Sequence, residues 1–385
     1  MLPDGWRSDK VGAVCAIKNN LRFPLSADER ARISGPYPYF GPTGVLDHID
    51  HFRIDEEFAL IGEDGDHFLK FRDRPMTLLF RGKANVNNHA HIVGDSADCL
   101  ARWFHYWFMH RDLTAVLSRQ GVGRYKLTKA GLEELNIWLP PIQEQSRISE
   151  LLGTWDAAIS TTEELLANSR AQKQALMHSL LSDRVRTHRG LGRLHRARAS
   201  DVFKPNSVRR NEGLPLLSVM QDVGVVPRES LGRKVVMPEG STDGYRRVDP
   251  GDFVISLRAF EGGLEYSRFT GMVSPAYTVI KPHVQIVDDF YRHYFKSAEF
   301  IGRLSVAVIG IRDGKQISYQ DFASLNIPRP PIREQERIAR LLNAVEAVIG
   351  KNQAMLEKLR SEKVALMQQL LSGKRRLRVP ASEAA

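Results

Sequence analysis

Two histidines separated by a single residue, His89 and His91 in the stretch NVNNHAHIV, come nearest in type and spacing to a metal site. Alternating side chains on a strand point to the same face, so both imidazoles could share one face. A zinc site, however, normally needs three or four ligands at suitable spacing, and no carboxylate or cysteine pairing accompanies these histidines. The sequence therefore predicts a structural histidine pair and no metal site.

The motifs of common catalytic sites are missing from the sequence. It contains neither a G-x-x-x-x-G-K-[ST] phosphate loop nor a G-x-G-x-x-G dinucleotide fingerprint. The stretches LPPI and RPPI hold a proline pair, but they lack the Asn or Asp before it and the aromatic residue after it with which amino-methyltransferases hold a flipped base. No nuclease-like grouping of Asp and Glu-x-Lys is convincing. We expect no catalytic site, and a two-domain enzyme would need a constellation that the sequence does not show.

The charge balance indicates a polyanionic partner. The 385 residues include 55 Lys and Arg against 45 Asp and Glu, a formal net charge of +10, and nucleic acid is the first such partner to consider. The two cysteines, Cys15 and Cys99, cannot form a disulfide framework and favour a reducing compartment. The opening residues lack an apolar signal core, and no run of about 18 apolar residues occurs. We expect a cytoplasmic protein without a membrane span.

One long segment occurs twice. PPIQEQSRISELL begins at Pro140 and PPIREQERIARLL begins at Pro330, and the shift of 190 residues aligns their surroundings without a gap. KQALMHSLLS and KVALMQQLLS align at the same shift. Because this shift is about half of the chain, the pattern indicates one duplicated unit rather than an array of short repeats. We expect two halves related by a pseudo-two-fold.

The repeated segment has the pattern of a long helix. A proline pair can begin a helix, and Glu144 and Glu334 follow where the helix dipole favours a carboxylate. Apolar residues then recur at heptad spacing over 142–182 and 332–372, which is typical of a coiled coil. Each helix would be about 60 Å long at about 1.5 Å per residue. The pseudo-two-fold predicts that the two helices pair antiparallel.

Two polar residues fall at the midpoints of the predicted helices and occupy the same heptad position. They are Thr162 and Asn352. We expect them to face each other and to fix the register of the pair, as a polar core residue can. The alternative is that Asn352 is tolerated at a solvated edge of the seam.

The segments before the two helices differ from each other and indicate two α/β domains. FALIGEDGDHFLKF and PMTLLF favour strands in the first, and GDFVISL, YSRFTG and AYTVI in the second. SADCLARWFHYWFMH, capped at Ser96, and DFYRHYFKSAEFIGRL favour helices. The predicted fold class is α/β (α+β), with two globular domains separated by two long helices that pair as an antiparallel coiled coil. The expected boundaries are 1–134 and 200–324 for the domains, 135–183 and 325–376 for the helical regions, 184–199 for a basic linker that is either a solvated tether or a phosphate contact, and 377–385 for a tail.

The twin PP-I-x-E-Q helices resemble the helical regions of the DNA specificity subunit of type I restriction-modification systems. YPYFGPTGVLDHIDHF, ALIGEDG and NVNNHAHIV in the first domain, and LPLLSVMQDVGVV and GMVSPAYTVI in the second, are similar to stretches of target recognition domains in that family. The resemblance covers nearly the whole chain, in the same order and twice over.

This resemblance implies that each domain reads one half of a split double-stranded DNA target, while the helices set the length of the unread gap. Two modification subunits, which bind S-adenosylmethionine and methylate adenine N6, would dock on this chain. Two restriction subunits with ATP- and Mg-dependent translocase and nuclease activity would join them. The chain itself would hold no cofactor and catalyse nothing. Two alternatives stay open: the specificity chain of a type II-like system with a fused cleavage and methylation partner, and a coiled-coil adaptor that binds no DNA.

DNA contacts are expected from side chains that reach phosphates or base edges, such as Arg on guanine and Asn on adenine. The competing interpretation is a solvated surface charge for each Arg or Lys and a turn for the Asn cluster. The candidates in the first domain are Tyr39, Gly41, Thr43, Lys70, Arg72, Arg74, Arg81, Lys83, Asn85, Asn87 and Asn88. Those in the second are Arg209, Arg210, Arg233, Lys234, Arg246, Arg247, Arg258 and Arg268. For docking of modification subunits we expect outward-facing residues near the helix starts: Gln145, Arg147, Gln335 and Arg337.

Overall fold

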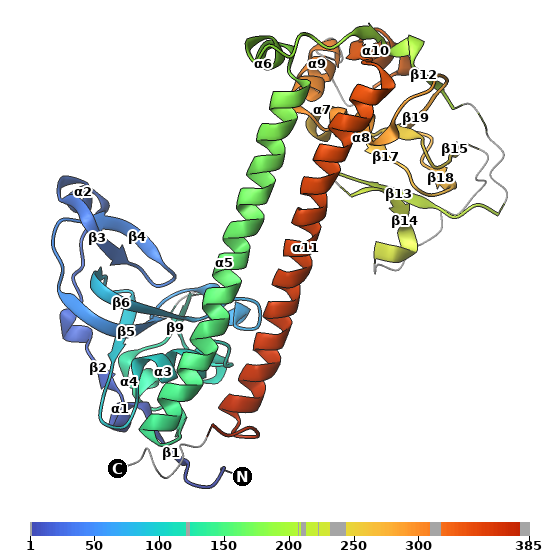
Figure 1. The fold of residues 1–385 in the computed structure, drawn as a ribbon. Coiled ribbons are helices and arrows are strands. Elements are labelled where there is room, and N and C mark those ends of the chain that lie inside the picture. Colours follow the sequence, from blue (N-terminus) through green and yellow to red (C-terminus); the bar gives the residue numbers. More distant parts are fainter. Residues whose placement is uncertain are drawn as a thin grey trace. The chain divides into compact units, whose positions relative to one another are not determined.

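The computed structural model describes residues 2–120, 124–206, 208, 213–221, 223–231, 244–308 and 317–377. The chain divides into two compact units, Met1–Thr161 with Leu356–Ala385, and Thr162–Met355. Two helices of 40 residues, α5 (Ile142–Leu181) and α11 (Ile332–Leu371), each contribute a part to both units (Figure 1). The long helices predicted over 142–182 and 332–372 are thus confirmed to within one residue. No helix in these ranges is both long enough and apolar enough to span a membrane.

A six-stranded sheet of order β2-β7-β5-β6-β3-β4 forms the centre of the first unit. Neighbouring strands are antiparallel except β3 and β6, which are parallel. Side chains of β5 alternate between two apolar clusters, so that Phe58 and Leu60 face one and Ala59 and Ile61 the other. The strands are β2 (Ala16–Ile17), β3 (Ser34–Phe40), β4 (Val45–Ile49), β5 (Ile54–Gly62), β6 (Thr77–Val86) and β7 (Ala90–Gly94).

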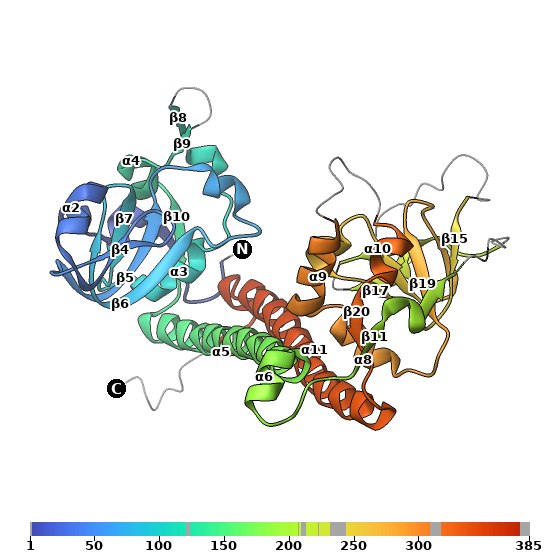
Figure 2. The same cartoon turned by 90° about the horizontal axis from the view of Figure 1, so that it is seen from above.

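An aromatic helix, α3 (Ala101–Phe108), covers one face of this sheet (Figure 2). Its start differs from the prediction because Ser96 accepts the backbone N–H groups of Asp98 and Cys99 and so closes a turn before the helix. Asp95 instead accepts the N–H of Ala101, the first helical residue. The other elements are β1 (Arg7–Lys10) paired with β10 (Asn136–Leu139), β8 (Ser118–Gln120) paired with β9 (Arg124–Lys126), α1 (Val11–Val14), α2 (Ala27–Arg32), α4 (Lys129–Glu133), and the 3-10 turns η1 (Asn19–Leu21), η2 (Asp66–Lys70) and η3 (Thr114–Val116).

The second unit is also mixed α/β, with a four-stranded sheet of order β12-β19-β16-β17. The single helix predicted over DFYRHYFKSAEFIGRL is two helices, because Ser297 donates to the last carbonyl of one, at Tyr294, and accepts the Phe300 N–H of the next. The strands are β11 (Arg196–Arg198), β12 (Phe203–Pro205), β13 (Leu217–Met220), β14 (Gly224–Pro227), β15 (Arg246–Val248), β16 (Phe253–Ile255), β17 (Glu265–Tyr266), β18 (Gly271–Val273), β19 (Thr278–Pro282) and β20 (Asn326–Pro328). The helices are α6 (Asp183–His188), α7 (Ala259–Gly262), α8 (Asp288–Tyr294), α9 (Ala298–Val308), α10 (Tyr319–Ala323), η4 (Ala199–Asp201) and η5 (Arg228–Leu231).

The basic segment 184–199 is folded as part of the second unit. It contains most of α6, and β11 pairs with β20. The guanidinium of Arg186 is buried and donates to the carbonyls of Leu180, Leu191 and Gly192. The interpretation of this segment as a solvated tether is therefore wrong.

Within each unit the two long helices run antiparallel, as predicted. In the second unit Lys173 of α5 contacts Glu346 of α11 at 2.6 Å, and the apolar seam beside it includes Leu180, Ile338 and Leu342. In the first unit Lys363 contacts Asp156, and Ile148 and Leu152 share a core with Leu370. The heptad stripe thus packs inside the molecule in both units.

The predicted pair of Thr162 with Asn352 is wrong. The side-chain amide of Asn352 donates to Ser169 Oγ at 3.3 Å. Ser169 follows Thr162 by seven residues, or about 10.5 Å along the helix. Asn352 therefore has a polar partner on α5, but the register is shifted by one heptad from the expected one.

Candidate nucleic-acid interface

Three turns of the first unit lie together: the turns that follow β3, β5 and β6. The turn from Gly41 to Gly44 closes with an N–H to carbonyl bond of 2.8 Å. The Asn87 N–H donates to the carbonyl of Phe40, and the Glu63 N–H donates to the carbonyl of His89 at 2.7 Å. The parallel pairing of β3 with β6 holds these turns in place because both strands end here. The stretches GPTG and NVNNH, separate in the sequence, thus share one surface.

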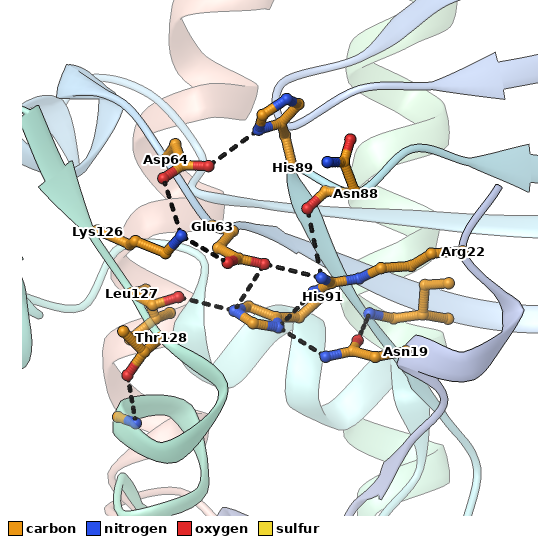
Figure 3. Close-up of polar contacts among 12 residues, drawn as sticks. Asn19, Arg22, Glu63, Asp64, Asn88, His89, His91, Lys126, Leu127 and Thr128 are labelled. Atoms are coloured by element: carbon orange, nitrogen blue, oxygen red, sulfur yellow. Dashed lines mark hydrogen bonds and ion pairs between the residues drawn. The ribbon is translucent and has the colours of Figure 1, made fainter. Parts of the chain in front are cut away.

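His91 lies beneath this surface with both ring nitrogens bonded (Figure 3). Nδ1 faces the side-chain nitrogens of Asn19 at 2.9 Å and Arg22 at 2.7 Å, which can only donate, so Nδ1 must accept. Nε2 lies 2.7 Å from the carbonyl of Leu127 and therefore carries the proton. Burial, together with the charge of Arg22, lowers the pKa of His91 and keeps the ring neutral.

Two neighbouring carboxylates organise the charges around His91. Glu63 contacts Arg22 at 2.8 Å and Lys126 at 3.1 Å, and Asp64 contacts His89 at 2.9 Å (Figure 3). The carboxylates hold these cations inside the network, so most of the charge is already compensated. The network therefore fixes the shape of the Asn87–His89 turn rather than offering free charge.

The two histidines of NVNNHAHIV do not converge on one point. His91 is buried, whereas His89 is exposed on the turn and directs its Nδ1 to Asp64. Within the ranges that the structure describes, no group of three or more His, Cys, Asp or Glu side chains could hold a metal ion. His91 serves as a buried structural residue.

Three predicted DNA contacts of the first domain are buried and have structural partners. The Tyr39 hydroxyl donates to the carbonyl of Phe23 and accepts the N–H of Leu25. Asn85 donates to the carbonyl of His51, and Asn87 accepts the N–H of His89. Tyr39, Asn85 and Asn87 are therefore not accessible to DNA, and the prediction is wrong for them.

The other candidates of the first domain have differing environments. Gly41 is buried, and a Cβ there would lie 2.7 Å from the side chain of Leu46, so this glycine shapes the turn. The rest are exposed and stay predicted DNA contacts: Thr43, Lys70, Arg72, Arg74, Arg81, Lys83 and Asn88.

In the second domain the described candidates fall into two kinds. Arg246 donates to the carbonyl of Pro275, and Arg247 forms a two-pronged ion pair with Asp249. Arg258 and Arg268 are exposed, and Arg268 lies over the ring of Tyr266. The remaining candidates lie outside the described residues: Arg209, Arg210, Arg233 and Lys234.

Gln145 and Gln335 are anchors and do not face outward. The Gln145 side chain accepts the Leu100 N–H at 3.0 Å and donates to the carbonyls of Asp98 and Pro140. Gln335 likewise accepts the Val287 N–H at 2.9 Å and donates to the carbonyl of Pro330. Both are buried, so the prediction of docking residues is wrong for them. Arg147 is half-buried, and Arg337 is exposed.

The neighbouring glutamates hold arginines that sequence reasoning missed. Arg376 contacts Glu144 at 2.7 Å in the first unit, and Arg186 contacts Glu334 at 2.6 Å in the second. Burial alone would raise the pKa of Glu144, but hydrogen bonds from Arg376 and Trp6 hold it below its usual value. The sequence did contain a signal for these two ion pairs, because the shift of 190 residues also aligns Arg186 with Arg376. Each Glu-Gln pair therefore fastens a long helix to its own unit.

These features define a class of protein: two unlike α/β domains, each fastened by the same contacts to the same pair of antiparallel helices. Comparison with known proteins then shows which proteins the chain is similar to. Residues 3–168 match the family described as "Type I restriction modification DNA specificity domain".

Relatives extend this similarity over most of the chain. The type I restriction enzyme MjaVIII specificity subunit of Methanocaldococcus jannaschii is 21% identical over an alignment of 409 residues, which covers 98% of this chain and 94% of that protein. A Haemophilus influenzae protein named as a type I restriction enzyme specificity subunit is 24% identical over 357 residues, 87% of this chain and 86% of that protein. In fold, the crystal structure of the type I restriction-modification S subunit from M. genitalium matches with a TM-score of 0.64 at 13% identity, covering 96% of this chain and 97% of that one. The resemblance of this chain to type I specificity subunits is confirmed.

Proposed function

We propose that this chain is the DNA-recognising specificity subunit of a type I restriction-modification complex, in which each unit reads one half of a bipartite, gapped, double-stranded target. The observation that carries the proposal is the repeated anchor of Gln145 and Glu144 in one unit and Gln335 and Glu334 in the other. It fastens two unlike domains to the helices in the same way. An asymmetric split target requires two different recognition domains that are attached to the helices in the same way.

Catalysis belongs to partner chains in this proposal. Two modification subunits hold S-adenosylmethionine and methylate adenine N6, and two restriction subunits use ATP and Mg to translocate and cut DNA. This chain contributes binding, through phosphate contacts that set position and base contacts that set specificity. The complex acts on cytoplasmic DNA.

The docking surface for a modification subunit is best placed on α11. Leu341, Val348 and Met355 follow each other at heptad spacing and are 45%, 47% and 52% exposed. They flank the seam residues Ile338 and Leu342, so the apolar face of α11 is wider than pairing with α5 covers. A helix with such a face suits a second helical neighbour.

A type II-like assembly and an adaptor function make different demands. The first needs one partner that both cleaves and methylates, whereas a type I assembly needs separate modification and translocating chains. The adaptor would show no salt-sensitive DNA binding even with its partner present, contrary to what the net charge of +10 favours.

Co-expression with the neighbouring modification subunit, in a host that lacks DNA methylation, tests the proposal. N6-methyladenine is mapped across the host genome by single-molecule sequencing, and complex formation is checked by co-purification. A gapped two-part motif with one modified adenine in each half is expected. A complex that forms but leaves the genome unmodified would contradict the proposal.

A further inference from the structure

Aromatic rings and cations gather on the surface of the first unit, around the loop between β4 and β5. We call this cluster the Phe52 patch: Phe23, Tyr37, His51, Phe52, Arg53 and Lys83. Four separate parts of the chain supply it, since Phe23 precedes α2, Tyr37 lies on β3 and Lys83 on β6. Phe52 is 37% exposed, and His51, Arg53 and Lys83 are exposed beside it.

Each cation of the Phe52 patch rests on a ring. The guanidinium carbon of Arg53 lies 3.9 Å from the ring centre of Phe23, and Lys83 Nζ lies 4.7 Å from that of Phe52. Tyr37 supports Phe52 edge to face at 5.0 Å. A ring holds a cation in position by its quadrupole and leaves the net positive charge uncompensated.

The charges of Arg53 and Lys83 are not neutralised within the described part of the chain. Neither residue forms an ion pair there, whereas Arg22 and Lys126 of the same unit both pair with Glu63. His51 contacts Asp50, and Asp55 is the strand partner of Lys83 without reaching ion-pair distance. Two cations held on rings but free of carboxylates are suited to an anionic ligand.

Backbone contacts hold the loop that carries these residues. Asn85, a buried residue, donates its side-chain N–H to the carbonyl of His51 at 2.7 Å. The Arg53 N–H donates to the carbonyl of Ala84, and the Arg53 side chain donates to the carbonyl of Arg22. The loop is thus ordered before any ligand binds, which lowers the entropic cost of binding.

We infer that Arg53 and Lys83 bind the phosphodiester backbone of double-stranded DNA, with Phe23 and Phe52 as the positioning residues that aim them. This inference rests on the proposed function and adds to it a specific backbone contact of the first unit. Side chains that contact phosphates supply affinity and register, and they leave the base sequence to other residues. Removing the two cations should therefore weaken binding to every sequence alike.

The test uses the full chain in complex with its modification subunit, with Arg53→Ala and Lys83→Ala combined. DNA carrying the wild-type methylation motif is titrated at several salt concentrations. We expect the slope of log K against log salt to fall in magnitude by about 2, since each lost phosphate contact removes about 0.9. Affinity should fall about tenfold per cation because charge-assisted bonds are lost, while the mapped methylation motif stays the same.

A matched control removes the same charge elsewhere in the unit. Lys10 and Lys129 are also exposed but face Glu134 and Glu133, so Lys10→Ala with Lys129→Ala should leave the slope nearly unchanged. For positioning, Phe52→Leu should weaken DNA binding while Phe52→Tyr, which keeps a ring under Lys83, should not. Thermal unfolding of each variant confirms that it is folded.

Three results would overturn the inference. The slope could be unchanged in the double variant, the control could lower it equally, or the methylated motif could change a base, which would make the Phe52 patch a base-reading site. If the wild-type complex itself shows no salt-sensitive DNA binding, the proposed function fails and this inference fails with it.

Discussion

Gln145 and Gln335 make the same connection in two places. Each amide oxygen accepts a backbone N–H of the neighbouring domain, from Leu100 or Val287, and each amide nitrogen donates to the carbonyl of the first proline of a Pro pair. Both side chains are buried, so water cannot replace these bonds once they are lost. A glutamine at this position therefore couples the start of a long helix to its domain.

Replacing Gln145 with alanine should destabilise the first unit by about 2–3 kcal/mol, because buried N–H and C=O groups lose their partners. Chemical denaturation, followed by the fluorescence of the tryptophans around α3, would measure this loss. The control is Gln143→Ala, which removes an exposed glutamine from the same helical turn and should change the free energy of unfolding by less than about 0.5 kcal/mol. If Gln145→Ala lowered the free energy of unfolding as little as the control does, the anchor would contribute nothing to stability.

His293 should make the second unit sensitive to acid. Its Nε2 lies 2.7 Å from Asn343 Oδ1, and burial, together with the charge of Arg292, lowers the pKa of His293 to about 4. The unfolded chain takes up this proton near pH 6.5, while the folded unit resists it until about pH 4. The contribution of neutral His293 to the free energy of unfolding is therefore complete above pH 6.5. It decreases as the pH drops toward 4, and about 2 kcal/mol of it is lost at pH 5.

The free energy of unfolding, measured from pH 7 to pH 5 for the wild type and for His293→Gln, checks this prediction. Glutamine can still donate to Asn343 but does not titrate, so the variant should lose less stability with falling pH, whatever its stability at pH 7. Parallel pH profiles of the two proteins would show that His293 is not the group responsible.

The long helices could be predicted to within one residue because their apolar period persists over 40 residues and no proline interrupts them. The register in which the two helices pair could not be predicted. A heptad pattern superposes on itself after seven residues, and Ser169, the partner of Asn352, is one heptad from Thr162. What distinguishes the alternatives is the ion pairs beside the seam, such as Lys173 with Glu346, and these depend on which side chains meet.

Candidate DNA contacts show the same limit for a different reason. Residue type indicates what a side chain could bind, but only the fold decides whether it reaches the surface. Asn85 and Asn88 are three residues apart on one turn-forming stretch, yet Asn85 holds the carbonyl of His51 inside the domain while Asn88 is exposed. The cations of the Phe52 patch needed the fold as well, because the rings beneath them come from distant segments.

At the scale of the helix, the exposed heptad row of α11 predicts where a modification subunit binds. Val348→Glu with Met355→Glu should weaken co-purification of that subunit at least tenfold, since a charge in an apolar contact loses its hydration. Ala347→Glu with Ala354→Glu is the control, because it places the same charges at exposed positions about 100° around the helix from the row. Loss of the partner in both variants would point to a general charge effect and against this surface.

At the scale of the whole molecule, the repeat gives both domains the same attachment while leaving their binding surfaces free to differ. The contacts of Glu144, Gln145 and Asp156 in the first unit recur as those of Glu334, Gln335 and Glu346 in the second. Because α5 and α11 each take part in both units, we propose that the length of the two helices sets the gap between half-sites. A change in helix length should then alter the gap and leave the two half-sites unchanged.

Inserting seven helical residues into both α5 and α11, after Thr161 and after Met355, tests this separation. Seven residues keep the heptad seam and add about 10.5 Å at 1.5 Å per residue, which corresponds to about three base pairs at 3.4 Å each. Methylation mapping should show the same two half-sites with a gap longer by about three base pairs. The same insertion in α5 alone should abolish modification, because the ion pairs of the two helices could then not form together. A double insertion that altered the half-sites and kept the gap would refute the role of the helices as a spacer, since the domains themselves are unchanged in that variant.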